Sequence, residues 1–321
     1  MTTTAKQLGW VPIYGEFDLS GDTIVFNGKR ITVPARAEPA ESETVERASL
    51  GLLLSSSSIV DGELSAEVEF DSLTPESACE IAVSYSNNPQ HLVTAGIGGQ
   101  AMFAIREFGG PATGSNQQPY WYYHWSGGER SGLKPKKKYR LDVKFRGSLI
   151  DLSIDGVEVS TVSVSFPQGR RRQVGILCQS ESRVTIRRFN VNAEQPTAFV
   201  VMQFDGAYDD IYKDVVQEVA TEYKVFNAAE FYGPGLIIAD IVQSIAAAQL
   251  VIADITPPNP NVYFEVGYAL ALNKPIILLA KKGTNLPFDV AAFRVQFYED
   301  TIGGKRRLEE GLKRHLEAIR A

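Results

Sequence analysis

The sequence predicts two domains of different class, an antiparallel β-sandwich followed by an α/β domain with a parallel sheet. A length of 321 residues suits two domains, and the hydrophobic share of 44% is ordinary for a globular protein. Before Glu194 apolar and polar residues alternate at period two, and after Pro196 continuous apolar runs are separated by segments with helical spacing. We therefore divide the chain into residues 1–193 and 197–321, joined by a short link.

Short alternating segments and turn signals characterise the first domain. Leu64–Phe70 and Tyr139–Phe145 alternate at period two, which predicts strands with one buried face. Asp155 and Gly156 predict a hairpin turn. Tyr120–Trp125 is a dense aromatic run that we expect mainly to fill the core, although exposed aromatic side chains of this kind bind sugars or bases. Many short strands without a long helix predict an antiparallel sandwich.

The second domain alternates short apolar runs with helical segments. Its first run, Phe199–Phe204, is apolar apart from Gln203, as expected for a parallel strand covered on both faces. Short links between alternating strands and helices imply right-handed crossovers, and five strands fit a flavodoxin-like order. The further strands are expected at Val225–Phe226, Leu250–Ile255, Pro275–Ala280 and Val295–Tyr298, and a closing helix at Lys305–Arg320.

A carboxylate close to the end of the expected strand Leu250–Ile255 is the main candidate for a catalytic group. Asn259 is a good helix N-cap and Pro260 suits the first helical position, so Glu265 falls in the second turn. Ligands of open α/β sheets bind beyond the carboxyl ends of the strands. Glu265 and Asp254 are therefore candidate catalytic residues, with Asn261 on the same helix face as Glu265.

Composition excludes several classes of protein. The formal net charge of -6 does not favour a nucleic-acid partner, and no apolar run is long enough to span a bilayer. The N-terminus has no apolar core of a secretory signal, and Cys79 and Cys178 are expected to be buried free thiols, so we expect a cytoplasmic protein. The three histidines lack ligand spacing, and no metal site is predicted.

Three segments of the second domain carry a family resemblance. They are FVVMQFDGAYDDIY at 199–212, VIADITPPNPNVYFEVGYALALNKPIILL at 251–279 and LPFDVAAFRVQFY at 286–298. Together they resemble the nucleoside 2-deoxyribosyltransferase-like branch of the TIR-like superfamily, many members of which are bacterial defence effectors. The resemblance covers about residues 197–300 and implies cleavage of a nucleotide N-glycosidic bond, with NAD as the leading substrate and no separate cofactor.

The resemblance also assigns roles to single residues. Glu265 matches the catalytic glutamate, and Asp254 matches the acidic residue that the family places after the third strand. Residues 257–260 (PPNP) replace the Asp-Ser-Gly-Thr type segment of true deoxyribosyltransferases. This difference makes deoxyribosyl transfer less expected than cleavage of the N-glycosidic bond. The substrate-binding candidates are Gln203, Phe204 and Asp205 of the first-strand loop, Tyr208 as a partner for a base, and Asn261.

The first domain has a resemblance of its own. YRLDVKFRGSLIDLSIDGVEV and GRRRQVGILCQSESRVTIRRFNV resemble the second half of a concanavalin A-like, laminin-G-like sandwich. Such domains bind carbohydrates or proteins, or serve as assembly modules. The match covers about residues 60–193.

The combined expectation is a TIR-like effector that cleaves a nucleotide, with antiviral defence as the implied role and a sandwich that senses or assembles. A homo-oligomer is expected, as is an activating ligand or protein on the sandwich. Three alternatives stay open: a non-catalytic nucleotide-binding signalling module, a deoxyribosyltransferase-like enzyme, and a glycan-binding sensor whose α/β domain is an adaptor.

Overall fold

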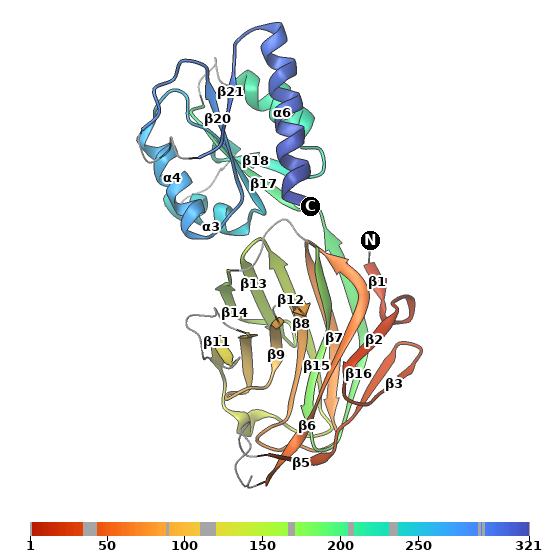
Figure 1. Ribbon diagram of the computed structural model, residues 1–321. Helices are drawn as coiled ribbons and strands as arrows, with labels where there is room; N and C mark the ends of the chain where they lie inside the picture. Colours follow the sequence, from red (N-terminus) through yellow and green to blue (C-terminus); the bar gives the residue numbers. More distant parts are fainter. Residues whose placement is uncertain are drawn as a thin grey trace. The chain divides into compact units, whose positions relative to one another are not determined.

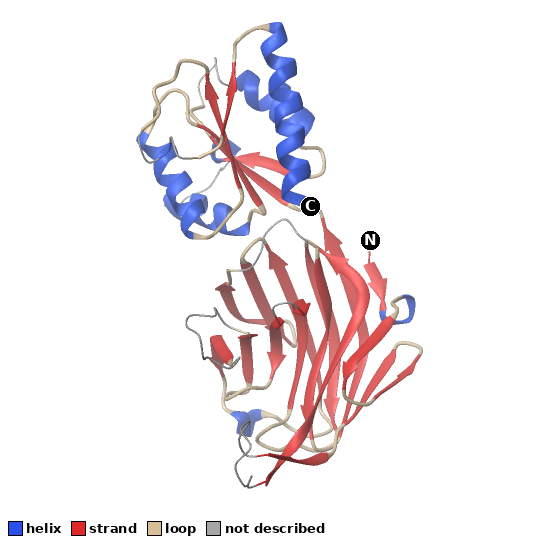
Figure 2. Ribbon diagram, viewed as in Figure 1, coloured by secondary structure: helices blue, strands red, loops and turns tan. Residues whose placement is uncertain are grey.

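A computed structural model describes residues 2–34, 44–87, 90–109, 120–165, 171–204, 209–230, 237–287, 290 and 293–320. The chain divides into two compact units. The first comprises Met1–Phe145, Ile150–Val162 and Arg171–Glu194, and the second comprises Arg146–Leu149, Ser163–Arg170 and Gln195–Ala321. Within the described ranges the first unit is built of strands with two three-residue 3-10 turns, and the longer helices belong to the second unit (Figure 2). No helix in these ranges is both long and apolar enough to cross a membrane.

The first unit is a sandwich of two sheets, and the predicted antiparallel sandwich is confirmed (Figure 1). Its first sheet, sheet A, has the order β14-β13-β12-β7-β16-β4-β3, and β1 also pairs with β16. The strands of sheet A are β1 (Thr2–Thr4), β3 (Phe17–Ser20), β4 (Thr23–Asn27), β7 (Asp61–Phe70), β12 (Lys138–Arg146), β13 (Leu149–Ile154), β14 (Val157–Ser163) and β16 (Arg183–Glu194).

Sheet B is the second layer and has the order β11-β10-β9-β8-β15-β6-β2, with β5 also paired to β6. Its strands are β2 (Trp10–Tyr14), β5 (Arg30–Pro34), β6 (Thr44–Ile59), β8 (Ala78–Asn87), β9 (Gln90–Ile97), β10 (Phe103–Phe108), β11 (Trp121–Gly127) and β15 (Arg172–Ser180). The 3-10 turns are η1 (Ala5–Gln7) and η2 (Arg130–Gly132).

The two faces of sheet B have different surroundings. Gly51 of β6 faces sheet A so closely that an added Cβ would lie 2.5 Å from the ring of Phe26 in β4. Leu52 points the other way because successive strand residues alternate. Leu52 belongs to a separate cluster with Leu54 and Leu92, which therefore lies on the outer face of sheet B.

Two local predictions for the sandwich are also confirmed. The hairpin between β13 and β14 turns at Asp155 and Gly156, whose φ values of 52° and 81° suit the turn type favoured by Asp-Gly. Cys79 and Cys178 are free and buried. They are direct cross-strand neighbours with their sulfur atoms 3.6 Å apart, which their distance of 99 residues in sequence does not suggest.

The second unit contains a five-stranded parallel sheet in the order β18-β17-β19-β20-β21. Every predicted strand of this unit is present. The strands are β17 (Thr197–Val201), β18 (Lys224–Asn227), β19 (Leu250–Asp254), β20 (Ile276–Lys281) and β21 (Val295–Tyr298). The helical segments are α1 (Asp209–Ile211), η3 (Tyr212–Val216, a π-helical turn), α2 (Gln217–Val219), η4 (Ala228–Glu230), α3 (Ile237–Ala247), α4 (Pro260–Ala271) and α6 (Ile302–Arg320).

Helices cover both faces of this sheet. Leu250 and Ile252 of β19 pack in one cluster with Tyr212 of η3 and Leu312 of α6. Val251 and Ala253, the intervening residues of β19, pack in a second cluster with α3 and α4, to which α4 contributes Val266. Alternation along β19 therefore assigns each strand side chain to one helix layer or the other.

The start of α4 permits a direct stability test. The Asn259 side chain accepts a hydrogen bond from the Asn261 N–H at 2.9 Å, and Pro260 occupies the first turn, as predicted. We expect Asn259→Ala to lower the free energy of unfolding of the second unit by about 1 kcal/mol, because an orphan helix N–H loses its acceptor. Denaturant titration followed by circular dichroism at 222 nm measures this loss in free energy of unfolding. Asn259→Asp keeps a capping oxygen and is the matched control, and equal losses in both variants would contradict the capping role.

Candidate functional site

Asp254 ends β19 and is buried, with 2% of its surface exposed. Its Oδ2 accepts a 2.7 Å hydrogen bond from the Tyr298 hydroxyl, and its Oδ1 accepts one from the Thr256 N–H at 2.9 Å. Burial raises the pKa of Asp254 to about 7, although both hydrogen bonds act to lower it. The carboxyl group is thus poised to change its charge near neutral pH.

Glu265 lies in α4 and is half-buried, and desolvation raises its pKa to about 7. Asp254 is four residues after Leu250 in the same strand, so the two side chains point to the same face of the sheet. Leu250 and Tyr298, whose hydroxyl donates a hydrogen bond to Asp254, both belong to the cluster under η3 and α6. Glu265 belongs to α4, which covers the opposite face. The two predicted catalytic carboxylates therefore belong to different layers of the unit.

The predicted substrate-binding residues have mainly structural surroundings. Gln203 Oε1 accepts a 3.4 Å hydrogen bond from the Asn259 side chain, which ties the end of β17 to the start of α4. Phe204 packs edge-to-face on Tyr212 with ring centroids 6.2 Å apart. Asn261 is exposed, and its backbone N–H serves the N-cap. The predicted site residues Asp205 and Tyr208 lie outside the described residues.

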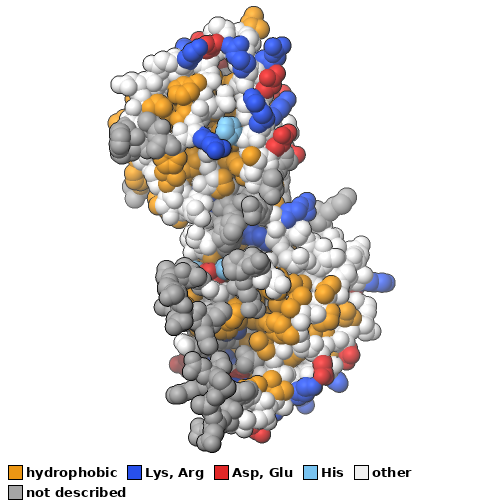
Figure 3. Space-filling view, in the orientation of Figure 1, with side chains coloured by type: hydrophobic (Ala, Val, Ile, Leu, Met, Phe, Trp, Pro, Cys, Tyr) orange, Lys and Arg blue, Asp and Glu red, His pale blue; other side chains and the backbone are white. Residues whose placement is uncertain are grey.

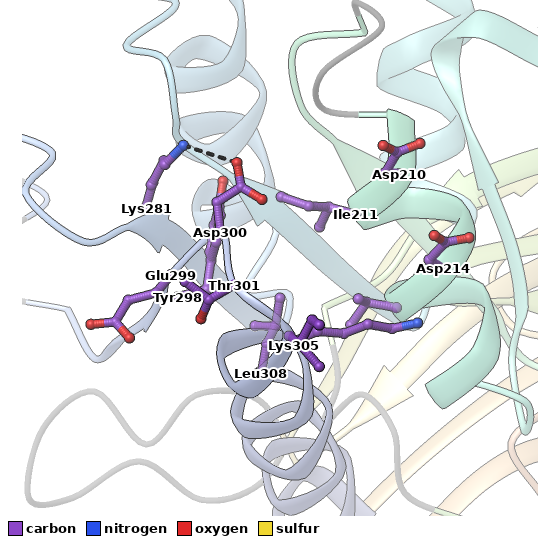
Figure 4. A pocket seen from close by; sticks show the side chains of 12 residues that line it. Asp210, Ile211, Asp214, Lys281, Tyr298, Glu299, Asp300, Thr301, Lys305 and Leu308 are labelled. Carbon is purple, nitrogen blue, oxygen red and sulfur yellow. Dashed lines mark hydrogen bonds and ion pairs between the residues drawn. The ribbon is translucent and has the colours of Figure 1, made fainter.

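A cleft of about 460 Å³ lies at the carboxyl ends of β20 and β21, against η3 and the start of α6 (Figure 4). Asp210 and Asp214 project from the same helical segment, and Lys281 forms a 3.4 Å ion pair with Asp300. The predicted site residues that the structure describes, Asp254, Glu265, Gln203, Phe204 and Asn261, are not among the described residues that line this cleft. Its described lining residues are Asp210, Ile211, Asp214, Val215, Lys281, Tyr298, Glu299, Asp300, Thr301, Ile302, Lys305 and Leu308.

An aromatic cavity of about 290 Å³ lies on the outer face of sheet B. It collects side chains from six strands that are far apart in sequence, and its lining residues are Tyr14 (β2), Leu50 and Leu52 (β6), Tyr85 (β8), Leu92 (β9), Phe108 (β10) and Trp121 (β11). None of these seven side chains carries a charge at neutral pH, and the phenol groups of Tyr14 and Tyr85 supply the polar atoms. Burial raises the pKa of Tyr14, which keeps its hydroxyl protonated.

Apolar side chains extend beyond the cavity on the same sheet. Leu50 at the cavity is 38% exposed, and beyond it Val11 of β2 is 58% exposed at a position paired with Leu54. Figure 3 shows hydrophobic side chains gathered on the surface of the sandwich unit.

A buried ion pair borders the aromatic cavity. The Arg106 Nε of β10 lies 2.9 Å and 3.0 Å from the two carboxylate oxygens of Glu80, and its guanidinium carbon lies 3.9 Å from the centre of the Trp121 ring. Thr94 donates a 2.6 Å hydrogen bond to Glu80. Burial alone would lower the pKa of Arg106, but the negative charge of Glu80 raises it, so the guanidinium stays charged.

A second polar group connects the strands that carry the cavity. Glu107 accepts 2.8 Å hydrogen bonds from His91 on β9 and His124 on β11. Burial alone would raise the pKa of Glu107, but the bonds from His124 and His91 lower it to about 2. No cluster of three or more potential metal ligands occurs within the described parts of the chain. The group therefore fixes three neighbouring strands through a charged carboxylate.

Sequence reasoning missed this cavity, although one signal pointed to it. The run Tyr120–Trp125 was expected mainly to fill the core, and that expectation is wrong. Tyr120 and Tyr122 are 46% and 52% exposed, and Trp121 is half-buried at the cavity. Because β11 is an edge strand of sheet B, the run has a neighbour on one side only. The other lining residues come from separate strands and carry no motif.

No protein-family model and no curated protein matches this sequence. Among solved structures, the chain is similar to the carbohydrate-binding module CBM66 from Bacillus subtilis, at 11% identity and a TM-score of 0.42, over 58% of this chain and 96% of that one. It is similar to a prokaryotic β-1,3-1,4-glucanase from a mouse hindgut metagenome at 8% identity, a TM-score of 0.37, and 60% and 98% coverage. The Bacillus licheniformis β-glucanase gives 8% identity, a TM-score of 0.36, and 60% and 94% coverage.

These findings overturn the predicted function. The similar structures are named for glycan binding and glycan hydrolysis rather than for nucleotide cleavage. The prediction that the chain cleaves a nucleotide N-glycosidic bond, with NAD as the leading substrate, is wrong. Asp254 and Glu265 are not among the described residues that line the 460 Å³ cleft.

Proposed function

We propose that the first unit is a glycan-binding module that uses the aromatic cavity on sheet B. The observation that carries this proposal is the convergence of Tyr14, Tyr85, Phe108 and Trp121 on one outward face of a sheet. Binding sites for small molecules are concave, largely apolar and supplied with a few polar groups. Pyranose rings present C–H groups on their faces and hydroxyls at their rims, which suits aromatic faces flanked by two phenol groups.

The charge of the cavity defines the class of glycan. The seven lining residues include no acidic or basic side chain. Arg106 lies nearby, but its charge is already balanced by the Glu80 carboxylate. An acidic or sulfated glycan would therefore lose hydration without gaining a free cation. We propose that the ligand is a neutral glycan, with all-equatorial glucans best suited because both ring faces present C–H groups.

The same geometry favours binding over hydrolysis. Glycoside hydrolysis in most families needs two carboxyl groups, about 5 to 9.5 Å apart, on either side of the scissile bond. None of the described lining residues is Asp or Glu. Glu80, which pairs with Arg106 beside Trp121, is fully buried and held in an ion pair. We therefore propose recognition of the glycan without cleavage.

For the second unit we propose a flavodoxin-like class with an adaptor role. Support comes from its strand order, which in chain order is 2-1-3-4-5 with parallel neighbours. The motif around Glu265 supports the proposal that the second unit is related to the TIR-like group in descent and fold. Assembly of the whole chain into a homo-oligomer is part of the same proposal.

The test is binding of the full chain to a glycan array, followed by isothermal titration calorimetry with soluble hits. We expect binding to neutral β-linked glucans and none to sulfated or uronic-acid glycans. Reducing-sugar release after prolonged incubation should be absent. An array without neutral glycan hits would refute the proposed function, and stoichiometric release of reducing ends would replace binding with hydrolysis.

A further inference from the structure

We propose that Arg106 is a positioning residue that sets the orientation of the Trp121 indole for the ligand. This inference rests on the proposed glycan site and adds a residue outside the cavity to it. Arg106 does not line the cavity, whereas Trp121 does. The guanidinium stacks 3.9 Å from the indole centre, so it covers one face of the ring.

Arg106 is itself held in a single position. Its Nε lies within 3.0 Å of both oxygens of Glu80, which is 0% exposed. Thr94 on the neighbouring strand donates a 2.6 Å hydrogen bond to the same carboxylate. Breaking such a buried pair leaves an uncompensated charge, so the guanidinium has no alternative position of comparable energy. The chain of contacts from Thr94 through Glu80 and Arg106 ends on Trp121.

Trp121 needs this support because of its location. It lies on β11, the edge strand of sheet B, and is only half-buried. Phe108, which also lines the cavity, contacts it with ring centroids 5.3 Å apart at an angle of 54°. Without the guanidinium, one face of the indole would lose its contact and the ring could rotate away. A ring held in its bound orientation binds more tightly because less side-chain freedom is lost on binding.

The experiment compares Arg106→Lys with the wild-type chain. Lysine keeps a positive charge for Glu80 but lacks the planar guanidinium that stacks on the indole. The first readout is Trp121 fluorescence, obtained by subtracting the spectrum of Trp121→Phe from that of the same chain with Trp121. The second is affinity for laminarihexaose and cellohexaose by calorimetry. Arg140→Lys on sheet A, whose partner is the neighbouring Asp142, is the matched control.

We expect Arg106→Lys to shift the Trp121 emission without ligand and to weaken oligosaccharide binding about tenfold, with Arg140→Lys unchanged in both. Unchanged Trp121 emission would overturn the positioning role even if binding falls. If wild type binds neither oligosaccharide, the proposed function fails while the emission still decides the role of Arg106. If Arg106→Lys does not fold, Thr94→Val is measured in its place, and unchanged emission there would overturn the proposal equally.

Discussion

Trp121→Ala is expected to remove most of the glycan affinity of the full chain while leaving the sandwich folded. Trp121 supplies the largest aromatic surface of the cavity and is half-buried on an edge strand, so its loss opens no closed core cavity. Central aromatic anchors of a binding site are each worth about 2 kcal/mol or more, which corresponds to at least about thirtyfold in dissociation constant. Calorimetric titration with a neutral glucan oligosaccharide measures the change.

Tyr122→Ala is the matched control for this experiment. Tyr122 is the next residue of the same strand, is 52% exposed and does not line the cavity. Successive strand side chains face opposite sides, so the two variants separate the cavity face from the other face of β11. Equal affinity losses in both variants would show that the ligand does not occupy the cavity. Melting curves of both variants verify that the unit remains folded.

Asp254→Asn is expected to stabilise the second unit above pH 7 by about 2 to 4 kcal/mol. The folded pKa of Asp254, about 7, is raised above its ordinary value of 3.8 by burial. The folded protein therefore binds more protons than the unfolded chain between these values. Its stability is fully present below pH 3.8 and is lost as the pH rises through 7. Asparagine removes the charge, keeps an acceptor for the Thr256 N–H, and can donate to the Tyr298 oxygen.

Circular dichroism at 222 nm follows this effect because the longer helices described here belong to the second unit. Denaturant midpoints should decline from pH 4 to pH 8 in the wild type and less steeply in Asp254→Asn. The remaining slope would report Glu265, whose pKa burial also raises to about 7. Asp300→Asn, with its side chain 86% exposed, is the control. A variant less stable than the wild type at pH 8 would contradict the assignment.

The second unit shows what periodicity can predict. Each expected strand is present, and the closing helix extends over Ile302–Arg320 against an expected start at Lys305. Continuous apolar runs and helical spacing determine such elements locally. The relation between Asp254 and Glu265 was missed because proximity to a strand end does not state which face a side chain occupies. Tertiary packing against Tyr298 decides that point.

The aromatic cavity lay further beyond prediction. Its residues come from strands between β2 and β11, and the alternation of each strand allows two assignments of its faces. Leu52 and Leu53 are both 0% exposed, yet one packs in the outer cluster and the other faces sheet A. No local sequence feature shows which of these two leucines points to the outer face. The strand order of sheet B is needed first, and it follows from pairings such as Cys79 with Cys178 across the unit.

The last two strands of the sandwich have a consequence for how the chain is made. β15 lies between β8 and β6 in sheet B, and β16 lies between β7 and β4 in sheet A, so both insert at interior positions. During synthesis sheet B cannot close until Ser180 has left the ribosome, and sheet A cannot close until Glu194 has left it. β6 and β7 therefore wait with open edges for more than a hundred residues. Contacts of such long range are slow to form and expose aggregation-prone strands meanwhile. We expect chains that end before β15 to accumulate in an insoluble form, and chaperone demand to peak just before the second unit emerges.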